Sequence, residues 1–357
     1  MVGPPLHGCR PHLVSPTNVA KTKIDELGEF ILRDTKYFKS SGSWDNLFHR
    51  CKGPSNFHEN IQHLQHSASR LLKKISTSGV PVLLKTRPWT LEERDFAMTR
   101  GNHLSAQEFT DFLRIEMSDM RKKGIFIVLP YDLVRHLDGL RLSPMGVVPQ
   151  RNRRPRTIID YTYSAVNEAT HKLTPQESMQ WGRALQRLLW FIYYADRRHG
   201  PVLLAKTDLS DGFYQLHLTP SGALQLAMPF PSTHDEPPLV AIPTRLPMGW
   251  TESPPVFSTA TETIADIANA HLEESMIMPP PHPLEPIASS QVPLRHSKKL
   301  GHFVHLSRTL MCTWMTLLRL YKVGTMPFAL EGLFSIPLIR YFDPMALPIH
   351  HERNRIR

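Results

Sequence analysis

The stretch that most constrains the fold of this chain covers residues 203–218, LLAKTDLSDGFYQLHL. An apolar run leads into Asp208, and a second carboxylate follows at Asp211, just before a turn at Gly212. Apolar and polar residues then alternate over 214–218, which predicts a strand that resumes after the turn. We therefore expect Asp208 to lie at the end of a buried strand and Asp211 in the turn that follows.

Size, charge and cysteine content limit the class of protein. The 357 residues, 41% of them hydrophobic, are enough for a sizeable core and two or three subdomains. Lys and Arg (42) outnumber Asp and Glu (32), and the net charge of +10 favours an anionic partner such as nucleic acid. The three cysteines, Cys9, Cys51 and Cys312, form no CxxC pair, so we expect neither a disulfide framework nor a cysteine zinc site.

No segment has the pattern of a signal peptide or a membrane anchor. The start, MVGPPLHGCRP, lacks an apolar core, and Arg319 and Glu331 interrupt the apolar stretches near the end. We therefore expect an intracellular protein, cytoplasmic or nuclear, that does not bind a membrane. The run HENIQH at 58–63 has one residue too many for the HExxH zinc helix, so we expect it to be a polar helix surface.

The first third of the chain is predicted to be a poorly ordered segment, 1–60, apart from a short amphipathic stretch around 24–32, followed by a helical lead, 61–135. Apolar spacing predicts a helix over 60–76 that ends at the GVP break. Two capping boxes predict two more helices, from Thr90 with Glu93 to about residue 99, and from Ser105 with Glu108 to about residue 122. We expect the last helix to bury Phe109, Phe112, Leu113 and Met117, and 126–129 to form a strand.

Residues 136–200 contain a predicted hairpin with a basic tip. The run SPMGVVPQRNRRPRTIIDYTYSAVN, residues 143–167, predicts one strand at Val147 and Val148 and a second over 157–160, before a helix over 176–196. A run of charge is commonly a solvated face, but arginines on a tight loop are also well placed to grip phosphates. The arginines of the tip are Arg151, Arg153, Arg154 and Arg156.

Three motifs in this order resemble the reverse transcriptase of a eukaryotic retrotransposon. SPMGVVPQRNRRPRTIIDY resembles the fingers hairpin, KTDLSDGFYQLHL resembles the first palm motif, and LPMGWTESPPVF at 246–257 is similar to the segment that supports the template and the incoming nucleotide. The resemblance covers roughly residues 140–270. It implies an α+β right-hand polymerase fold, with fingers over 136–200 and a palm over 201–275 whose sheet is incomplete.

The resemblance implies RNA-directed DNA synthesis by two-metal nucleotidyl transfer. Joining a 3′ hydroxyl to a dNTP requires two divalent ions about 4 Å apart, held by carboxylates. Because Mg²⁺, or Mn²⁺ in its place, takes oxygen ligands, the implied catalytic and metal-binding residue is Asp208, assisted by the backbone carbonyl of Leu209. The implied partners are an RNA or DNA template-primer and the dNTP.

The same resemblance implies a set of nucleotide-binding residues. Phe213, five residues after Asp208, occupies the position of the steric gate that excludes a ribose 2′ hydroxyl, although an aromatic residue there can also be ordinary core. Met248 stands where retroviral enzymes commonly have Gln, and the basic loop departs from the usual Lys-plus-Gly form. The implied nucleotide-binding residues are Arg151, Arg156, Asp211, Gly212, Phe213, Met248 and Gly249.

The chain lacks the second acidic motif of a polymerase palm, Tyr-x-Asp-Asp. A Pro-rich linker, 276–300, leads instead into a tail, 301–357, that resembles nothing in the family. The run MCTWMT at 311–316 has nearly fixed codons, and reading the same bases one base earlier forces two adjacent aspartates and permits DVYVDD. We infer a frameshift before about residue 305, and we expect loose structure after about residue 275.

The predicted function is therefore that of a reverse transcriptase domain that is inactive in this chain, a pseudoenzyme, because the second metal ion would be poorly held. Two alternatives stay open. The net charge of +10 also favours a non-catalytic nucleic-acid-binding relic. A metal-dependent hydrolase that uses Asp208 and Asp211 would need further carboxylates or histidines nearby.

Overall fold

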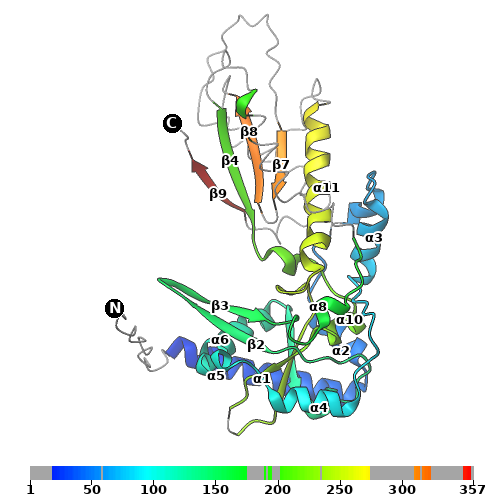
Figure 1. Cartoon of the computed structure of the whole chain (residues 1–357), viewed down its shortest axis with the longest axis vertical. Helices are drawn as coiled ribbons and strands as arrows, with labels where there is room; N and C mark the ends of the chain where they lie inside the picture. The colour runs from blue at the N-terminus through cyan, green and yellow to red at the C-terminus, as the bar shows by residue number, and fades with distance from the viewer. Residues whose placement is uncertain are drawn as a thin grey trace, which may run out of the picture.

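The computed structural model describes residues 18–57, 59–174, 189, 192–194, 202–233, 235–273, 309–313, 316–322 and 349–354. For 202–208, 268–273 and the last three segments it describes the backbone alone. The fold is mixed α+β, with helices packed around small antiparallel sheets (Figure 1). The helix predicted over 176–196 falls almost entirely outside the described residues, as does the linker at 276–300. None of the described helices combines the length and hydrophobicity needed to span a bilayer.

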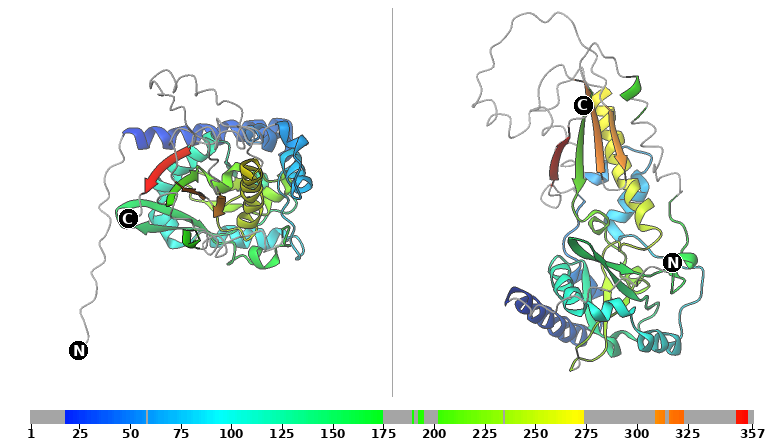
Figure 2. Two further views of the ribbon diagram at one scale, coloured as in Figure 1. Left: turned by 90° about the horizontal axis from the view of Figure 1, so that it is seen from above. Right: turned by 60° about the vertical axis from the view of Figure 1, so that its left-hand side comes forward.

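Two helices form where we expected little order. Helix α1 (Asn18–Ser41) buries Leu27, Ile31 and Phe38 along one face, and helix α2 (Trp44–Cys51) follows it. The long α1 lies against α6 and β1 and runs along one edge of the molecule (Figure 2). The expectation for 1–60 is therefore corrected from residue 18 onward. The amphipathic pattern of this segment forms a helix because its apolar face has a core to cover.

The segment from 59 to 134 is mostly helical, apart from residues 79–90 and a strand over 126–130, and its element boundaries differ from those predicted. The helix predicted over 60–76 forms as two pieces, since the His66 ring accepts the backbone N–H of Ala68 between them. Thr90 and Glu93 form the predicted capping box at the start of α4. The elements are η1 (Glu59–His63), α3 (Ser69–Ser78), α4 (Leu91–Arg100), α5 (Leu104–Glu108), α6 (Thr110–Lys122) and α7 (Tyr131–Val134).

The second predicted capping box does not form. Ser105 lies inside α5, and its hydroxyl accepts the backbone N–H of Val147 at 3.0 Å. Helix α6 begins after a break at Phe109, which like Phe112 is only half-buried. Leu113 and Met117 are buried as expected, and Ser105 joins the helical segment to the hairpin rather than capping a helix.

A three-stranded sheet forms the centre of the core. It has the order β1-β6-β5, antiparallel throughout, and every residue of β5 and β6 is buried. The predicted basic hairpin forms a separate two-stranded sheet. The strands are β1 (Phe126–Pro130), β2 (Met145–Gln150), β3 (Arg153–Ile159), β5 (Met228–Phe230) and β6 (Leu239–Pro243), and two short helices, α8 (Val166–Ala169) and α10 (Pro220–Leu224), lie between them in sequence.

A second, four-stranded sheet contains β4 and three short segments of the tail. Strand β4 (Val202–Leu209) lies inside the antiparallel order β7-β8-β4-β9, formed with β7 (Thr309–Thr313), β8 (Thr316–Lys322) and β9 (Ile349–Asn354). Helix α11 (Ser253–Glu273) lies along this sheet beside β7 (Figures 1 and 2). The expectation of loose structure after about residue 275 falls mostly on residues outside the described ones, and only these three strands of the tail are described. An unpaired β4 would leave two edges of N–H and C=O groups, and β8 and β9 pair with these edges through their own backbone groups.

The strand predicted after the Gly212 turn is not a regular strand. The chain instead forms a short 3-10 helix, η4 (Gly212–Gln215), followed by isolated bridges that pair Leu218 with Val80 and His217 with Arg245. Leu216 and Leu218 are buried, but the polar residues Gln215 and His217 are buried too, so the alternation in the sequence corresponds neither to a regular strand nor to alternating burial.

Candidate functional site

A cavity of about 380 Å³ lies between helix α6, the hairpin β2–β3 and the turn after β4. Five predicted site residues line this cavity: Arg156, Leu209, Asp211, Gly212 and Met248. They come from all three motifs identified in the sequence. The other polar or charged lining residues are Glu116, Gln150, Arg154, Thr157 and Tyr214, while most of the remaining wall is apolar.

The turn after β4 depends on two residues with positive φ. Asp211 has φ 56° and Gly212 has φ 24°, in the region that aspartate and glycine tolerate better than other residues. The Asp211 carboxylate accepts a hydrogen bond of 2.7 Å from the Lys123 ammonium. The backbone oxygen of Asp211 accepts a hydrogen bond of 2.7 Å from the backbone N–H of Tyr214. The turn is thereby held against the end of α6.

The third motif reaches the cavity through a glycine. Gly249 has φ 98°, and a Cβ at this position would lie 2.6 Å from the backbone oxygen of Ile159. Asn167 holds the same loop by donating its side-chain N–H to the Gly249 oxygen at 3.0 Å. The close approach brings Met248 beside β3, with its sulfur 4.0 Å from Nη2 of Arg156.

The arginines of the hairpin differ in whether they form an ion pair and in whether they line the cavity. Arg154 pairs with Glu116 at 3.0 Å, and the other Glu116 oxygen accepts the Thr157 hydroxyl at 2.6 Å. Arg156 is exposed and lines the cavity, and no ion pair of its guanidinium is found among the described residues. Arg151 lies at the tip and does not line the cavity. Arg156 is therefore the cavity cation best placed to meet an anion.

Phe213 lies behind the cavity wall. Its side chain is 5% exposed and packs edge-on against Phe257, with ring centroids 5.4 Å apart. The next residue, Tyr214, lines the cavity instead. Burial raises the pKa of Tyr214, and the nearby Glu116 and Asp211 raise it further, so its phenol is neutral. The role of Phe213 as a steric gate stays a prediction.

Asp208 is the second-last residue of β4, and only its backbone is described. It lies opposite Thr316 of β8 on one side and His350 of β9 on the other. Neither neighbour is a carboxylate, and the described part of the chain contains no group of three His, Cys, Asp or Glu side chains suited to a metal ion. These residues do not fit a two-metal centre, so the role of Asp208 and Leu209 in metal binding stays a prediction.

Sequence reasoning missed Glu116 and Lys123, which pair with the cavity residues Arg154 and Asp211. Glu116 lies on α6 four residues after the half-buried Phe112, and an acidic side chain on such a helix face is a weak signal that was available. No sequence pattern indicated a role for Lys123, because its contact with Asp211 spans 88 positions in the sequence.

Comparison with known proteins assigns no family to the chain. No protein-family model matches it, and no curated protein matches it either. The case for a function therefore depends on the motifs and on the cavity where they meet.

Proposed function

We propose that this chain is the fingers and palm region of a retrotransposon reverse transcriptase, that it binds a nucleotide in the cavity beside Arg156, and that it does not polymerise. The observation that carries the proposal is the convergence of three motifs, separated by up to 92 positions between Arg156 and Met248, on one cavity. The resemblance names those motifs independently of their positions in space. A chance resemblance gives no reason for the same residues to share a cavity.

The cavity has the properties that a nucleotide requires. Its volume of about 380 Å³ falls in the range of about 300–1,000 Å³ that is typical of small-molecule sites. Apolar side chains such as Met117, Met145 and Met228 offer a surface for a base or a sugar, and Arg156 offers a planar guanidinium to a phosphate. Bound Mg²⁺ would supply charge neutralisation in an active relative, but the residues here do not complete its site.

The register of the second sheet supports the frameshift hypothesis. Thr313 pairs with Thr316 across the β7–β8 connection, and Thr316 lies opposite Asp208. In the shifted frame the two aspartates are encoded by bases of codons 314 to 316. The missing carboxylates would therefore fall beside Asp208, at the place where a second acidic motif is required.

The alternative of a non-catalytic relic that binds nucleic acid shares part of this proposal. Arg151 and Arg153 are exposed, and no ion pair of either is found among the described residues, so the hairpin tip can contact a nucleic-acid backbone. Binding of this kind weakens steeply with salt. The hydrolase alternative has no such support, because no further metal ligand accompanies Asp208 and Asp211 in the described part of the chain.

Substitution of Arg156 tests nucleotide binding directly. We expect Arg156→Met to weaken the binding of a dNTP, measured by calorimetry, by about tenfold or more, because a hydrogen bond to a charged group contributes about 1.5–3 kcal/mol. Arg153→Met is the matched control, since Arg153 is exposed on the same strand and does not line the cavity. Equal losses in the two variants, or no dNTP binding by the unaltered chain, would reject the proposed site.

A further inference from the structure

A second cavity, of about 450 Å³, shares no lining residue with the first. It lies between the segment that precedes α4 and the loop that precedes β2. Its volume is also within the range of about 300–1,000 Å³ of small-molecule sites. The residues that line this cavity include Val82, Leu83, Thr86, Arg141, His171 and Gln225.

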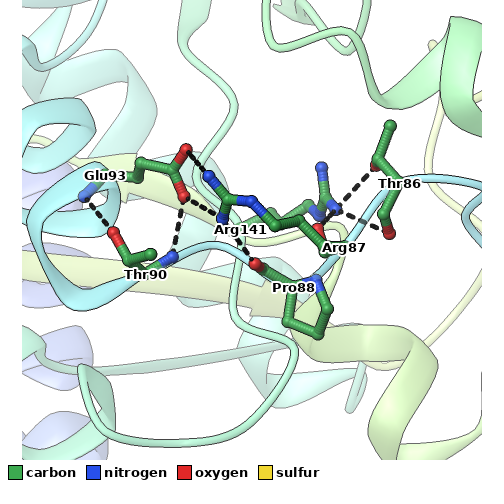
Figure 3. Close-up of polar contacts among 6 residues, drawn as sticks. All are labelled: Thr86, Arg87, Pro88, Thr90, Glu93 and Arg141. Atoms are coloured by element: carbon green, nitrogen blue, oxygen red, sulfur yellow. Dashed lines mark hydrogen bonds and ion pairs between the residues drawn. The ribbon is translucent and has the colours of Figure 1, made fainter.

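Arg141 is almost completely buried in the wall of this cavity, with 4% of its surface exposed. One nitrogen, Nη2, makes all its described hydrogen bonds, to the Thr86 hydroxyl at 2.8 Å, the Thr86 backbone oxygen at 3.4 Å and the Arg87 backbone oxygen at 2.5 Å (Figure 3). Within the described residues, Nη1 and Nε of Arg141 have no hydrogen bond, and the guanidinium has no ion pair.

Glu93, the carboxylate whose charge acts on Arg141, is already hydrogen-bonded to other groups. Glu93 accepts two bonds of 2.8 Å from the Arg87 guanidinium and a third from the backbone N–H of Thr90 (Figure 3). The acceptors of Arg141 are therefore all neutral oxygens. Burial of a charge without a direct partner of opposite sign is costly, and burial lowers the pKa of Arg141; the Arg87 charge lowers it further, and the Glu93 charge opposes the shift.

The position of the guanidinium is fixed from two sides. Nη2 of Arg141 donates hydrogen bonds to three oxygens, and Cζ of Arg141 lies 5.5 Å from the centre of the Trp89 ring. A cation over an aromatic face loses little freedom when it binds an anion, because its orientation is already set. The remaining N–H groups of Arg141 are thus available to a ligand in the cavity.

We propose that this second cavity binds a phosphate group, which accepts hydrogen bonds from the N–H groups of Nη1 and Nε of Arg141. The exposed His171 imidazole, which also lines the cavity, supplies a further donor. Arginine recognises phosphate oxyanions well, and a phosphate would provide the directly paired counter-ion that Arg141 lacks among the described residues. This inference does not depend on the proposed function, since no residue of the Arg156 cavity takes part.

Calorimetry with inorganic phosphate and pyrophosphate, and binding of a DNA duplex at matched ionic strength, test the proposal. Leu83→Glu places a carboxylate in the cavity wall at a residue that is 50% exposed, and leaves the bonds of Arg141 intact. Leu104→Glu is the matched control, since Leu104 is 69% exposed and lines neither cavity. We expect Leu83→Glu to weaken phosphate-group binding at least about tenfold relative to the control.

The ligands separate the possible sources of the phosphate. If Leu83→Glu, but not Leu104→Glu, loses binding of inorganic phosphate or pyrophosphate and keeps duplex binding, the ligand is a free phosphate. If Leu83→Glu loses duplex binding and keeps the binding of the small phosphates, the ligand is a nucleic-acid backbone. Arg141→Met should reproduce whichever loss is seen, provided that its circular dichroism is unchanged. Equal binding of all three ligands by Leu83→Glu and Leu104→Glu, or no binding by the unaltered chain, would overturn the proposal.

Discussion

Replacement of Arg121 by methionine is expected to lower the free energy of unfolding by about 3–5 kcal/mol, because it leaves a buried carboxylate without its partner. Nε and Nη2 of Arg121 donate to the two oxygens of Asp34 at 2.7 and 2.9 Å. The two side chains are 8% and 2% exposed and join α6 to α1. Nη2 also donates to the Cys51 sulfur at 3.0 Å, and burial raises the pKa of that thiol to about 11.

Urea denaturation measures this effect, and the neighbouring residue provides the control. Lys122 pairs with Glu26 at 3.1 Å, but its side chain is 68% exposed. We expect Lys122→Met to change the free energy of unfolding by less than about 1 kcal/mol, as for exposed ion pairs in general. Similar losses in Arg121→Met and Lys122→Met would contradict the importance of the buried pair.

Acidification is expected to destabilise the protein through His217. Burial lowers the pKa of this ring to about 3, the Arg245 charge adds to the effect, and the hydrogen bond from the ring to the Lys52 oxygen opposes it. The unfolded chain binds the proton near pH 6.5 and the folded chain near pH 3, so the unfolded state holds more protons between these values. Stability from His217 is therefore complete above pH 6.5 and is lost as the pH falls towards 3.

The expected loss across this window is roughly 4–5 kcal/mol, since each pKa unit corresponds to about 1.4 kcal/mol. His217→Gln should show a flatter dependence of unfolding free energy on pH, whereas His136→Gln, at an exposed position, should match the unaltered chain. Urea titrations at several pH values give the comparison. Equal slopes for all three proteins would show that His217 is not the group responsible.

Local signals predicted the elements whose partners lie close in sequence. Thr90 and Glu93 are three residues apart and form their capping box, and the β2–β3 hairpin closes over a short turn. Ser105 has the same local signal as Thr90 but bonds to Val147, 42 residues away. A capping motif predicts a helix start only when no distant backbone group competes for the hydroxyl.

The tail shows a similar limit for strands. Whether residues 309–322 pair with anything depends on the open edges of β4, which lies about a hundred positions earlier. The reading-frame hypothesis predicts loose structure after about residue 275, because sequence outside a selected frame has no reason to pack. Most of 274–357 lies outside the described residues, and the three described strands pair through backbone groups, which requires little from side chains.

The motifs predicted part of the site, and tertiary packing decided the rest. Arg156, Asp211 and Met248 meet at one cavity because the Gly249 loop approaches β3 closely. Lys123 is part of the same site only because α6 ends beside the turn after β4. No pattern along the sequence reports such a contact.

Primer extension tests the central claim most directly. The chain is compared with a version in which the frame under residues 311–316 is restored, with Mg²⁺ or Mn²⁺, a primed RNA template and dNTPs. We expect no incorporation by the unaltered chain and incorporation by the restored one, which Asp208→Asn should abolish. Incorporation by the unaltered chain that disappears in Asp208→Asn would contradict the claim that this chain holds only half of an active site.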